Sequence, residues 1–303
     1  MAARQLRWLL GGELLFYTLL GSWLVSSGGW TPLQAAGLGL AGALGMRLYF
    51  VLLSFGLMLG AGRGVPASLR IGPLRALRMV LEEYAGLILL FTVVQPFEKF
   101  WLGADRLGHC AARRTPLLLI HGYQCNRGFW FWLRRKLEAA GWTVATHNLE
   151  PVFGDIDDYA DGIARRIDEV LAATGAAQLI LVGHSMGGLA SRAYLRRFGK
   201  ARVARLVTLG TPHQGTRLAR LGPGSNARQM RLGSSWLSEL AAQDVLPQGS
   251  VSIYSYHDNY VFPQETATRL DGAAHVAIGG VSHIGMAVSP RLLEKLREVL
   301  ESP

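Results

Sequence analysis

Cysteine is scarce in this chain, which has only Cys110 and Cys125 among its 303 residues. Two cysteines alone cannot hold a zinc ion, and the sequence has no C-x-x-C or H-E-x-x-H pattern, so the usual signatures of a metal hydrolase are missing. It also has no motif typical of a nucleic-acid-binding module. We therefore expect no metal, no cofactor and no nucleic-acid partner. Two free thiols are the simpler interpretation, because a disulfide would require an oxidising compartment.

Charged side chains are scarce near the N-terminus. Residues 8–59 contain one acid, Glu13, and one base, Arg47, and the mean hydropathy of the whole chain is +0.22. An apolar helix of about 20 residues crosses the hydrocarbon core of a bilayer. We therefore expect two retained spans, at about residues 6–25 and 33–62, within a membrane region of residues 1–105. A cleaved signal peptide is the alternative, but its apolar core would be shorter.

The link between the two apolar runs, residues 26–32, is uncharged and rich in turn-forming residues, so it predicts a tight helical hairpin. Glu13 and Arg47 would be costly in lipid unless they pair or reach the interface, and a pair between the two helices is the interpretation we favour. Several glycines of the second run suit close helix packing. They are Gly37, Gly39, Gly42 and Gly45.

Arginines flank the hairpin at both ends, which by the positive-inside rule places both ends in the cytoplasm. A third uncharged run, residues 84–97, is either a short span reaching about residue 101 or a helix lying at the interface. We favour the span, because the run is apolar on all sides and aromatic residues crowd its far end. That choice places the following domain on the periplasmic side of a bacterial inner membrane. The flanking arginines are Arg4, Arg7, Arg63, Arg70, Arg75 and Arg78.

From about residue 115, short apolar runs alternate with segments of helical spacing. Strands alternating with helices predict a mostly parallel sheet covered on both faces, so we expect an α/β domain over residues 115–303. The expected strands are 116–120, 141–147, 179–182, 203–209, 250–256 and 275–279, and the main expected helices are 129–140, 155–174, 186–198 and 289–301.

A G-x-S-x-G motif with Ser185 at its centre follows the expected strand at 179–182 and precedes a helix. This strand-turn-helix setting is that of a nucleophile elbow, in which the serine stands at a sharp, strained turn. A β-carbon at Gly183 or Gly187 would collide with neighbouring backbone. We therefore predict that Ser185 is a catalytic nucleophile and that the two glycines are required by the turn.

A serine hydroxyl needs a base and a carboxylate that orients the base, in the chain order Ser, acid, His. His283 follows the last expected strand in a loop, and Asp258 ends the strand before it. We predict these two as base and acid. Asp271 and Asp244 are the rival acids, and the other histidines downstream of Ser185 are His213, His257 and His275.

Negative charge on a tetrahedral intermediate needs backbone N–H donors. We expect one donor at Met186, directly after the nucleophile. The second is expected at Tyr123, in the turn after the first strand of the domain, where Gly122 lets the chain turn. His121 is interpreted as a structural group that fixes this loop.

At these motifs the sequence resembles the bacterial lipases and esterases of the α/β-hydrolase superfamily, over about residues 115–300. The resemblance implies an α/β-hydrolase fold and selects the same Ser185, Asp258 and His283, with Tyr123 and Met186 as oxyanion donors. Secreted lipases lack the N-terminal membrane region found here. The matching pieces are residues 119–123, 183–188, 208–216, 258–261 and 281–283.

The expected function is therefore a serine carboxylic-ester hydrolase acting on a lipid or other apolar ester at a membrane. A membrane-bound acyltransferase or thioesterase could use the same residues, and a membrane interaction protein without activity is the alternative from a different class. Residues 216–248, which carry several large apolar side chains, are either a lid or acyl-chain wall or an ordinary helical cover.

Overall fold

The computed structural model of the chain describes residues 1–61, 64–109 and 114–302. Cys110 and Arg63 lie outside these ranges. Cys125 is a free, buried thiol, and burial raises the pKa of this thiol to about 12.

Six parallel strands form one sheet in the order β2-β1-β3-β4-β5-β6, which confirms the α/β fold predicted from the alternating pattern. Every predicted strand is present, and most end within a residue or two of the expected position. The strands are β1 (Leu117–Ile120), β2 (Val144–His147), β3 (Leu179–His184), β4 (Val203–Leu209), β5 (Val251–Ser255) and β6 (Ala274–Ile278).

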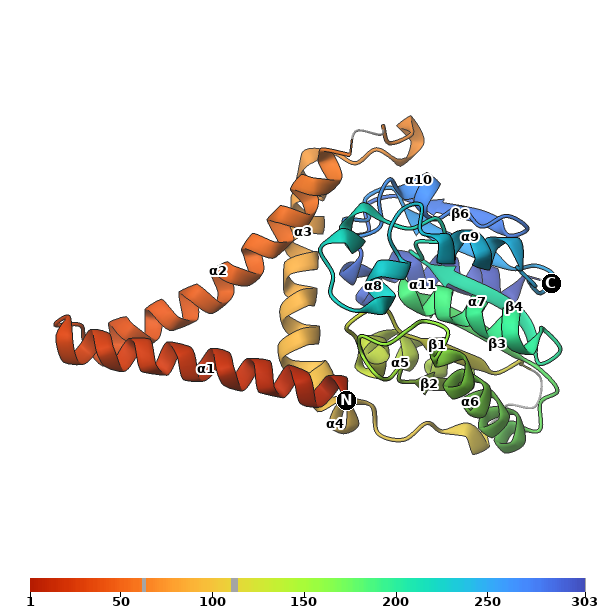
Figure 1. Ribbon diagram of the computed structural model, residues 1–303, viewed down its shortest axis with the longest axis horizontal. Helices are drawn as coiled ribbons and strands as arrows, with labels where there is room; N and C mark the ends of the chain where they lie inside the picture. The colour runs from red at the N-terminus through yellow and green to blue at the C-terminus, as the bar shows by residue number, and fades with distance from the viewer. Residues whose placement is uncertain (62–63, 110–113, 303) are drawn as a thin grey trace.

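Helices cover both faces of the sheet (Figure 1). Alternate side chains of β1 point to opposite faces: Leu117 and Leu119 join one buried cluster with α5 and α11, and Leu118 and Ile120 join a second with α6 and α7. Both faces of β1 are therefore apolar and buried, as is typical of a strand in a parallel sheet. These helices are α5 (Phe131–Ala139), α6 (Tyr159–Thr174), α7 (Met186–Phe198) and α11 (Pro290–Glu301).

The start of α6 differs from the prediction, which placed it at residue 155. Asp155 instead accepts the backbone N–H of Asp157 at 3.0 Å and the side-chain amide of Gln229 at 2.6 Å. These bonds stabilise a turn, and the helix begins at Tyr159. The shorter segments of the domain are α8 (Ser225–Gln229), α9 (Ser235–Ala242), α10 (Gln264–Ala267) and single turns at Leu107–His109, Arg127–Trp130, Arg217–Arg220 and Ile284–Val288.

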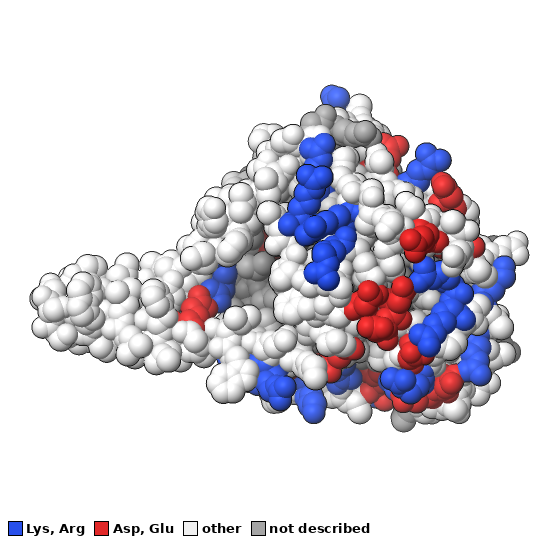
Figure 2. Space-filling view, viewed as in Figure 1, with Lys and Arg blue, Asp and Glu red and all other residues white. Residues whose placement is uncertain are grey.

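Two long helices, α1 (Ala2–Ser27) and α2 (Pro32–Leu59), form a hairpin that extends away from the sheet as an arm (Figure 1). Both are long and apolar enough, by length and composition, to cross a bilayer, and most of their side chains are exposed. Figure 2 shows the arm as almost entirely uncharged, apart from one acidic and one basic group.

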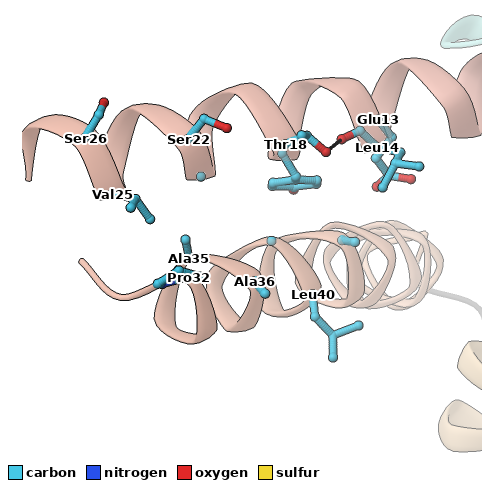
Figure 3. Close-up of a pocket in the computed structure, with 14 residues that line it drawn as sticks. Glu13, Leu14, Thr18, Ser22, Val25, Ser26, Pro32, Ala35, Ala36 and Leu40 are labelled. Carbon is cyan, nitrogen blue, oxygen red and sulfur yellow. Dashed lines mark hydrogen bonds between the residues drawn. The ribbon is translucent and has the colours of Figure 1, made fainter.

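Glu13 and Arg47 form the predicted pair, with both guanidinium nitrogens Nη1 and Nη2 at 2.7 Å from the two carboxylate oxygens. A cavity lies between α1 and α2, and Val25 and Ala35 point into the gap (Figure 3). Tyr17 of α1 packs over Gly42 of α2, where an added Cβ would lie 2.6–2.9 Å from the tyrosine ring and hydroxyl.

Four glycines were expected to allow close helix packing, and in the structure only two of them lie against the other helix. Gly39 and Gly42 lie against Tyr17, whereas Gly37 and Gly45 have no heavy atom of a described neighbour within 4 Å of the position of a Cβ. The close approach of the helices is therefore confined to one stretch of the hairpin.

Both ends of the arm are attached to the rest of the molecule. The N-terminal ammonium of Met1 pairs with Glu150, and Arg7 donates to the carbonyl of Pro96 at 2.6 Å. At the other end, Val51 and Phe55 of α2 pack in a cluster with Met79 of α3. The arm, α3 and the sheet domain therefore form a continuous structure.

The third apolar run does not stand free as a span. It continues α3 (Pro73–Ile88) through a π-helical turn (Leu89–Val94) and a 3₁₀ turn (Gln95–Phe97) into α4 (Glu98–Leu102). Leu90 and Val94 are fully buried in the same cluster as β1 and α5. The run therefore packs in part against the α/β domain, and it is not one of the two helices of the described chain that are long and apolar enough to cross a bilayer.

Candidate active site

The turn between β3 and α7 carries Ser185 in a strained conformation. Ser185 has φ 54° and ψ −126°, and it is one of two residues other than glycine with positive φ in the described chain. Its backbone N–H donates to the carbonyl of Leu209 at 2.9 Å, which fixes the turn against β4. A non-glycine residue persists in this region only where its surroundings determine the conformation, and such strain concentrates at functional sites.

The glycines of the elbow are required by close approach, as predicted. A Cβ on Gly183 would lie 2.6 Å from the backbone of Gly188, and a Cβ on Gly187 would lie 2.2 Å from the carbonyl oxygen of Ile120. Gly122 is also needed at its position, because a Cβ added there would lie only 2.9 Å from the Cβ of Ser185. These glycines let the loop after β1 lie directly against the nucleophile.

Asp258 and His283 are joined by a hydrogen bond of 2.8 Å between Oδ2 and Nδ1. The other carboxylate oxygen of Asp258 accepts the backbone N–H groups of Tyr260 and Val261, each at 2.8 Å. The Asp258 carboxylate is therefore held by three hydrogen bonds, and Nε2 is the ring nitrogen of His283 that does not contact it. His283 and Ser185 line one cavity.

The pKa of His283 reflects opposing effects. Burial of the imidazole lowers it, but the negative charge of Asp258 and the hydrogen bond to that carboxylate outweigh burial, so the net pKa is raised above its ordinary value. A raised pKa makes the ring a stronger base.

The remaining downstream histidines have structural partners. His213 contacts Arg192 and Thr208 at 3.2 and 3.0 Å, and His275 accepts the backbone N–H of Leu270 at 3.0 Å. His257 accepts the backbone N–H of Gly280 at 3.0 Å. None of these three contacts a carboxylate among the hydrogen bonds found in the described chain.

The rival acids are engaged elsewhere. Asp244 forms a two-pronged pair with the buried Arg192, at 2.9 and 2.6 Å. Asp271 is exposed and pairs with Arg269 on the surface. Of the three aspartates considered as the acid, Asp258 is therefore the one that forms a hydrogen bond with a histidine.

The loop after β1 is held by His121, as expected. Nε2 of His121 accepts the backbone N–H of Leu149 at 3.0 Å, and Nδ1 lies 2.9 Å from the carbonyl of Gly122. Burial lowers the pKa of His121 to about 4, so the ring is neutral. Tyr123, the predicted oxyanion donor, lines the cavity beside Ser185. Neither its backbone N–H nor that of Met186 has a protein partner within the described ranges.

Sequence reasoning missed a buried carboxylate behind the histidine. Glu83 of α3 is fully buried; Oε1 accepts the amide of Asn259 at 3.0 Å, and Oε2 accepts the backbone N–H of Gly285 at 2.9 Å. Asn259 in turn accepts the backbone N–H of His283 at 3.0 Å and donates to Ser54 of α2 at 2.7 Å. The N-terminal helices thus hold both loops that carry the acid and the base.

The cavity at Ser185 has a volume of about 570 Å³, within the usual range for ligand sites. The two parts of the segment 216–248 have different surroundings. Leu218, Leu221 and Met230 line the cavity, whereas Leu237 and Leu240 of α9 pack in the cluster over the sheet. The first part is therefore a wall of the site, and the second is an ordinary helical cover.

Comparisons with known proteins agree with this geometry. Residues 115–249 match the family described as the alpha/beta hydrolase fold. Over 117 residues the chain is 36% identical to triacylglycerol lipases of Pseudarthrobacter phenanthrenivorans and Burkholderia plantarii. The match covers 36% of this chain in both cases, and 36% and 32% of the two relatives, so the chain spans about a third of the length of the curated relatives it matches.

The fold is shared with a solved Bacillus licheniformis lipase in its mature form. The TM-score is 0.58 at 20% identity, over 65% of this chain and 96% of the lipase. At that identity the likeness concerns the fold. Together, the parallel sheet, the strand-turn-helix elbow and the matched family model show that this part of the chain has the α/β-hydrolase fold, and over 117 residues it is similar to bacterial triacylglycerol lipases.

Proposed function

We propose that the chain is a serine ester hydrolase in which Ser185, His283 and Asp258 form the catalytic triad. The observation that carries the proposal is the 2.8 Å Asp258–His283 hydrogen bond beside a strained serine that lines the same cavity. The triacylglycerol lipases that the chain resembles support the same class of reaction.

In the proposed reaction, Nε2 of His283 takes the hydroxyl proton of Ser185 as Oγ attacks the ester carbonyl. The carbonyl oxygen becomes negatively charged and is stabilised by the backbone N–H groups of Tyr123 and Met186. Collapse of this intermediate breaks the ester C–O bond, and His283 gives its proton to the departing alcohol. Water then attacks the acyl-enzyme by the same route, releases the acid and regenerates the serine.

Asp258 acts through the imidazole. Because Oδ2 accepts the Nδ1–H, the ring keeps the tautomer whose Nε2 is unprotonated and directed away from the acid. The positive charge that forms on His283 during attack is stabilised by the same carboxylate.

The substrate is an apolar ester or a lipid. The cavity is lined mainly by aliphatic and aromatic side chains, including Phe50, Leu53 and Phe91 outside the sheet domain and Leu218 and Met230 within it. Such a surface binds a hydrocarbon chain through burial of apolar area and offers no cluster of charges for an ionic acid.

The two helices of the arm span a membrane and keep the enzyme there. An exposed helix that is apolar on all sides is stable in hydrocarbon and costly in water. Both ends of the arm contact the α/β domain, through Met1 with Glu150 and Ser54 with Asn259. Arg4 and Arg7 lie in the first turns of α1 and Arg70, Arg75 and Arg78 follow α2, so by the positive-inside rule we expect the domain on the cytoplasmic face.

Replacement of the nucleophile tests the activity. Ser185→Ala should lower hydrolysis of p-nitrophenyl butyrate by about 10⁴-fold or more, since removal of a triad member commonly costs that much. The variant should also lose labelling by a fluorophosphonate probe while its melting temperature in detergent stays near that of the wild type. A folded variant with a tenth of the wild-type rate would show that another residue is the nucleophile.

A further inference from the structure

The cavity at Ser185 is not closed by the α/β domain alone. One side of it is formed by side chains of α2, the second helix of the arm, at positions spaced as one face of a helix. These side chains, here named the α2 wall, are Met46, Phe50, Leu53 and Leu57. They line the same cavity as Ser185, His283 and Tyr123, so a ligand that fills this cavity contacts both the arm and the proposed catalytic residues.

The other faces of α2 have different surroundings. Val51 and Phe55 are buried against α3, whereas Leu48 and Leu52 are exposed and do not line the cavity. The α2 wall itself is more than a third exposed, even though it faces the cavity. The helix therefore has one face on the protein, one on the cavity and one on its surroundings, and all three are mainly apolar, with Arg47 and Ser54 as the polar residues at the cavity.

If the arm crosses the bilayer as proposed, with Pro32 at the far edge of the hydrocarbon core, the α2 wall lies where the arm leaves that core. With a rise of about 1.5 Å per residue, Met46 lies about 21 Å and Leu57 about 38 Å along the helix from Pro32 at the tip. A hydrocarbon core is about 30 Å thick, so the wall crosses the level at which the core ends. An acyl chain in the adjacent leaflet and the cavity thus meet along one apolar helix face.

The charged residue of α2 that lines the cavity is already paired. Arg47 lines the cavity, but its guanidinium is paired with Glu13 through two hydrogen bonds of 2.7 Å. The wall therefore offers a hydrocarbon surface with no unpaired cation, which suits a fatty acyl chain and not an anionic headgroup.

We propose that the α2 wall is the acyl-chain subsite of the enzyme, and that it takes the long acyl chain of an ester lipid directly from the bilayer to Ser185. This proposal rests on the proposed ester hydrolase activity and adds its substrate class and the route of the chain. The apolar part of the substrate stays in contact with hydrocarbon or with α2 throughout, so its transfer does not expose the chain to water.

The test uses the full chain reconstituted in phosphatidylcholine vesicles, with p-nitrophenyl palmitate and p-nitrophenyl butyrate as substrates. The measured quantity is the ratio of kcat/KM for the palmitate to that for the butyrate. Leu53→Trp, which fills the cavity from the α2 wall, should lower this ratio by at least about tenfold. Leu52→Trp, the neighbouring exposed position outside the cavity, is the matched control and should leave the ratio unchanged.

A second variant covers the case in which tryptophan at residue 53 prevents folding. Phe50→Ala removes contacts from the wall without adding bulk and should lower the ratio severalfold, since each buried methylene contributes about 0.8 kcal/mol. Ratios equal to that of the wild type in Leu53→Trp and Phe50→Ala would overturn the acyl-chain subsite. Ser185→Ala is assayed in parallel, because hydrolysis that persists in that variant would refute the proposed activity instead.

Discussion

At the scale of single residues, the proposed role of His283 as the base predicts how the rate depends on pH. The ring must be unprotonated to accept the serine proton, so kcat/KM should rise with pH and reach half its maximum at the pKa of His283. Burial alone would lower that pKa, but the charge and hydrogen bond of Asp258 raise it above the ordinary 6.5. The midpoint of the acid limb, measured with p-nitrophenyl butyrate, is therefore expected above pH 6.5.

Asp258→Asn supplies the control for this assignment. Loss of the carboxylate removes the main effect that raises the pKa, so the acid limb should move to lower pH while the maximal rate falls by about 10⁴-fold. The other groups facing His283 are Glu83, His184 and Tyr260, and they remain in the variant. An unchanged rate and an unmoved limb would transfer the role of the acid to another carboxylate.

Glu83 is predicted to be a positioning residue that acts through the loop of His283. Both of its oxygens accept hydrogen bonds, and an amide in its place offers a single oxygen for Asn259 and Gly285. Glu83→Gln should therefore lower kcat by about tenfold with little change in KM, since an unmade buried hydrogen bond costs about 1–3 kcal/mol. Its acid limb should also move to lower pH, because the charge of Glu83 raises the pKa of His283.

Glu82→Gln is the matched control for that substitution. Glu82 is the next residue on the same helix, but it is exposed and pairs only with Arg78 on the surface. Its kinetics should match the wild type. If Glu83→Gln and Glu82→Gln were alike in kcat and in pH profile, the buried carboxylate would have no part in holding the base.

At the scale of elements, the nucleophile elbow depends on backbone contact that no other residue permits. Gly187→Ala would place a methyl group 2.2 Å from the carbonyl oxygen of Ile120, which separates α7 from β1 or prevents folding. We expect a loss of about 3 kcal/mol or more, measured as a fall in the melting temperature in detergent. Gly45→Ala, also within a helix but with open space around it, should melt at or above the wild-type temperature.

The elements differ in how well the sequence predicts them. The strands of the sheet were predicted because each is a short apolar run ended by turn residues, and Ser185 was found because the elbow is a local motif. Asp258 and His283 followed from chain order. These features depend on neighbours in the sequence, which is the information that a single chain contains.

Glu83 and the third apolar run could not be predicted in the same way. The hydrogen bonds of Glu83 join residues 176 and 202 positions apart, and no local pattern encodes them. Residues 84–97 are apolar on all sides both in a membrane span and in a segment packed within a protein core, so composition did not distinguish the two. The structure adds the packing of Leu90 and Val94 against the sheet domain, a long-range contact that the composition does not encode.

At the scale of the whole molecule, the arm is expected to make the protein integral to the membrane. Alkaline carbonate strips peripheral proteins but leaves proteins with hydrophobic spans in the pellet. The full-length chain should therefore remain in the membrane pellet. For a chain that begins after residue 61, the fraction left in the pellet measures how strongly the surface of α3 alone binds the membrane. Release of the full-length protein into the supernatant would contradict the proposal that α1 and α2 cross the bilayer.

The proposed membrane anchor also predicts on which side of the bilayer the domain lies. Met1 pairs with Glu150 and α2 packs against α3, so if α1 and α2 cross the bilayer, the N-terminus, the end of the hairpin and Ser185 are expected on one side and the uncharged link at residues 28–31 on the other. The arginines gather at the domain end, which the positive-inside rule assigns to the cytoplasm.

Alkaline phosphatase is active only where its disulfides form, outside the cytoplasm. Fused after Pro303 it should be inactive, and fused after Gly29 it should be active. The reverse pattern, in fusions expressed at equal levels, would place the active site in the periplasm and the arginines on the wrong side.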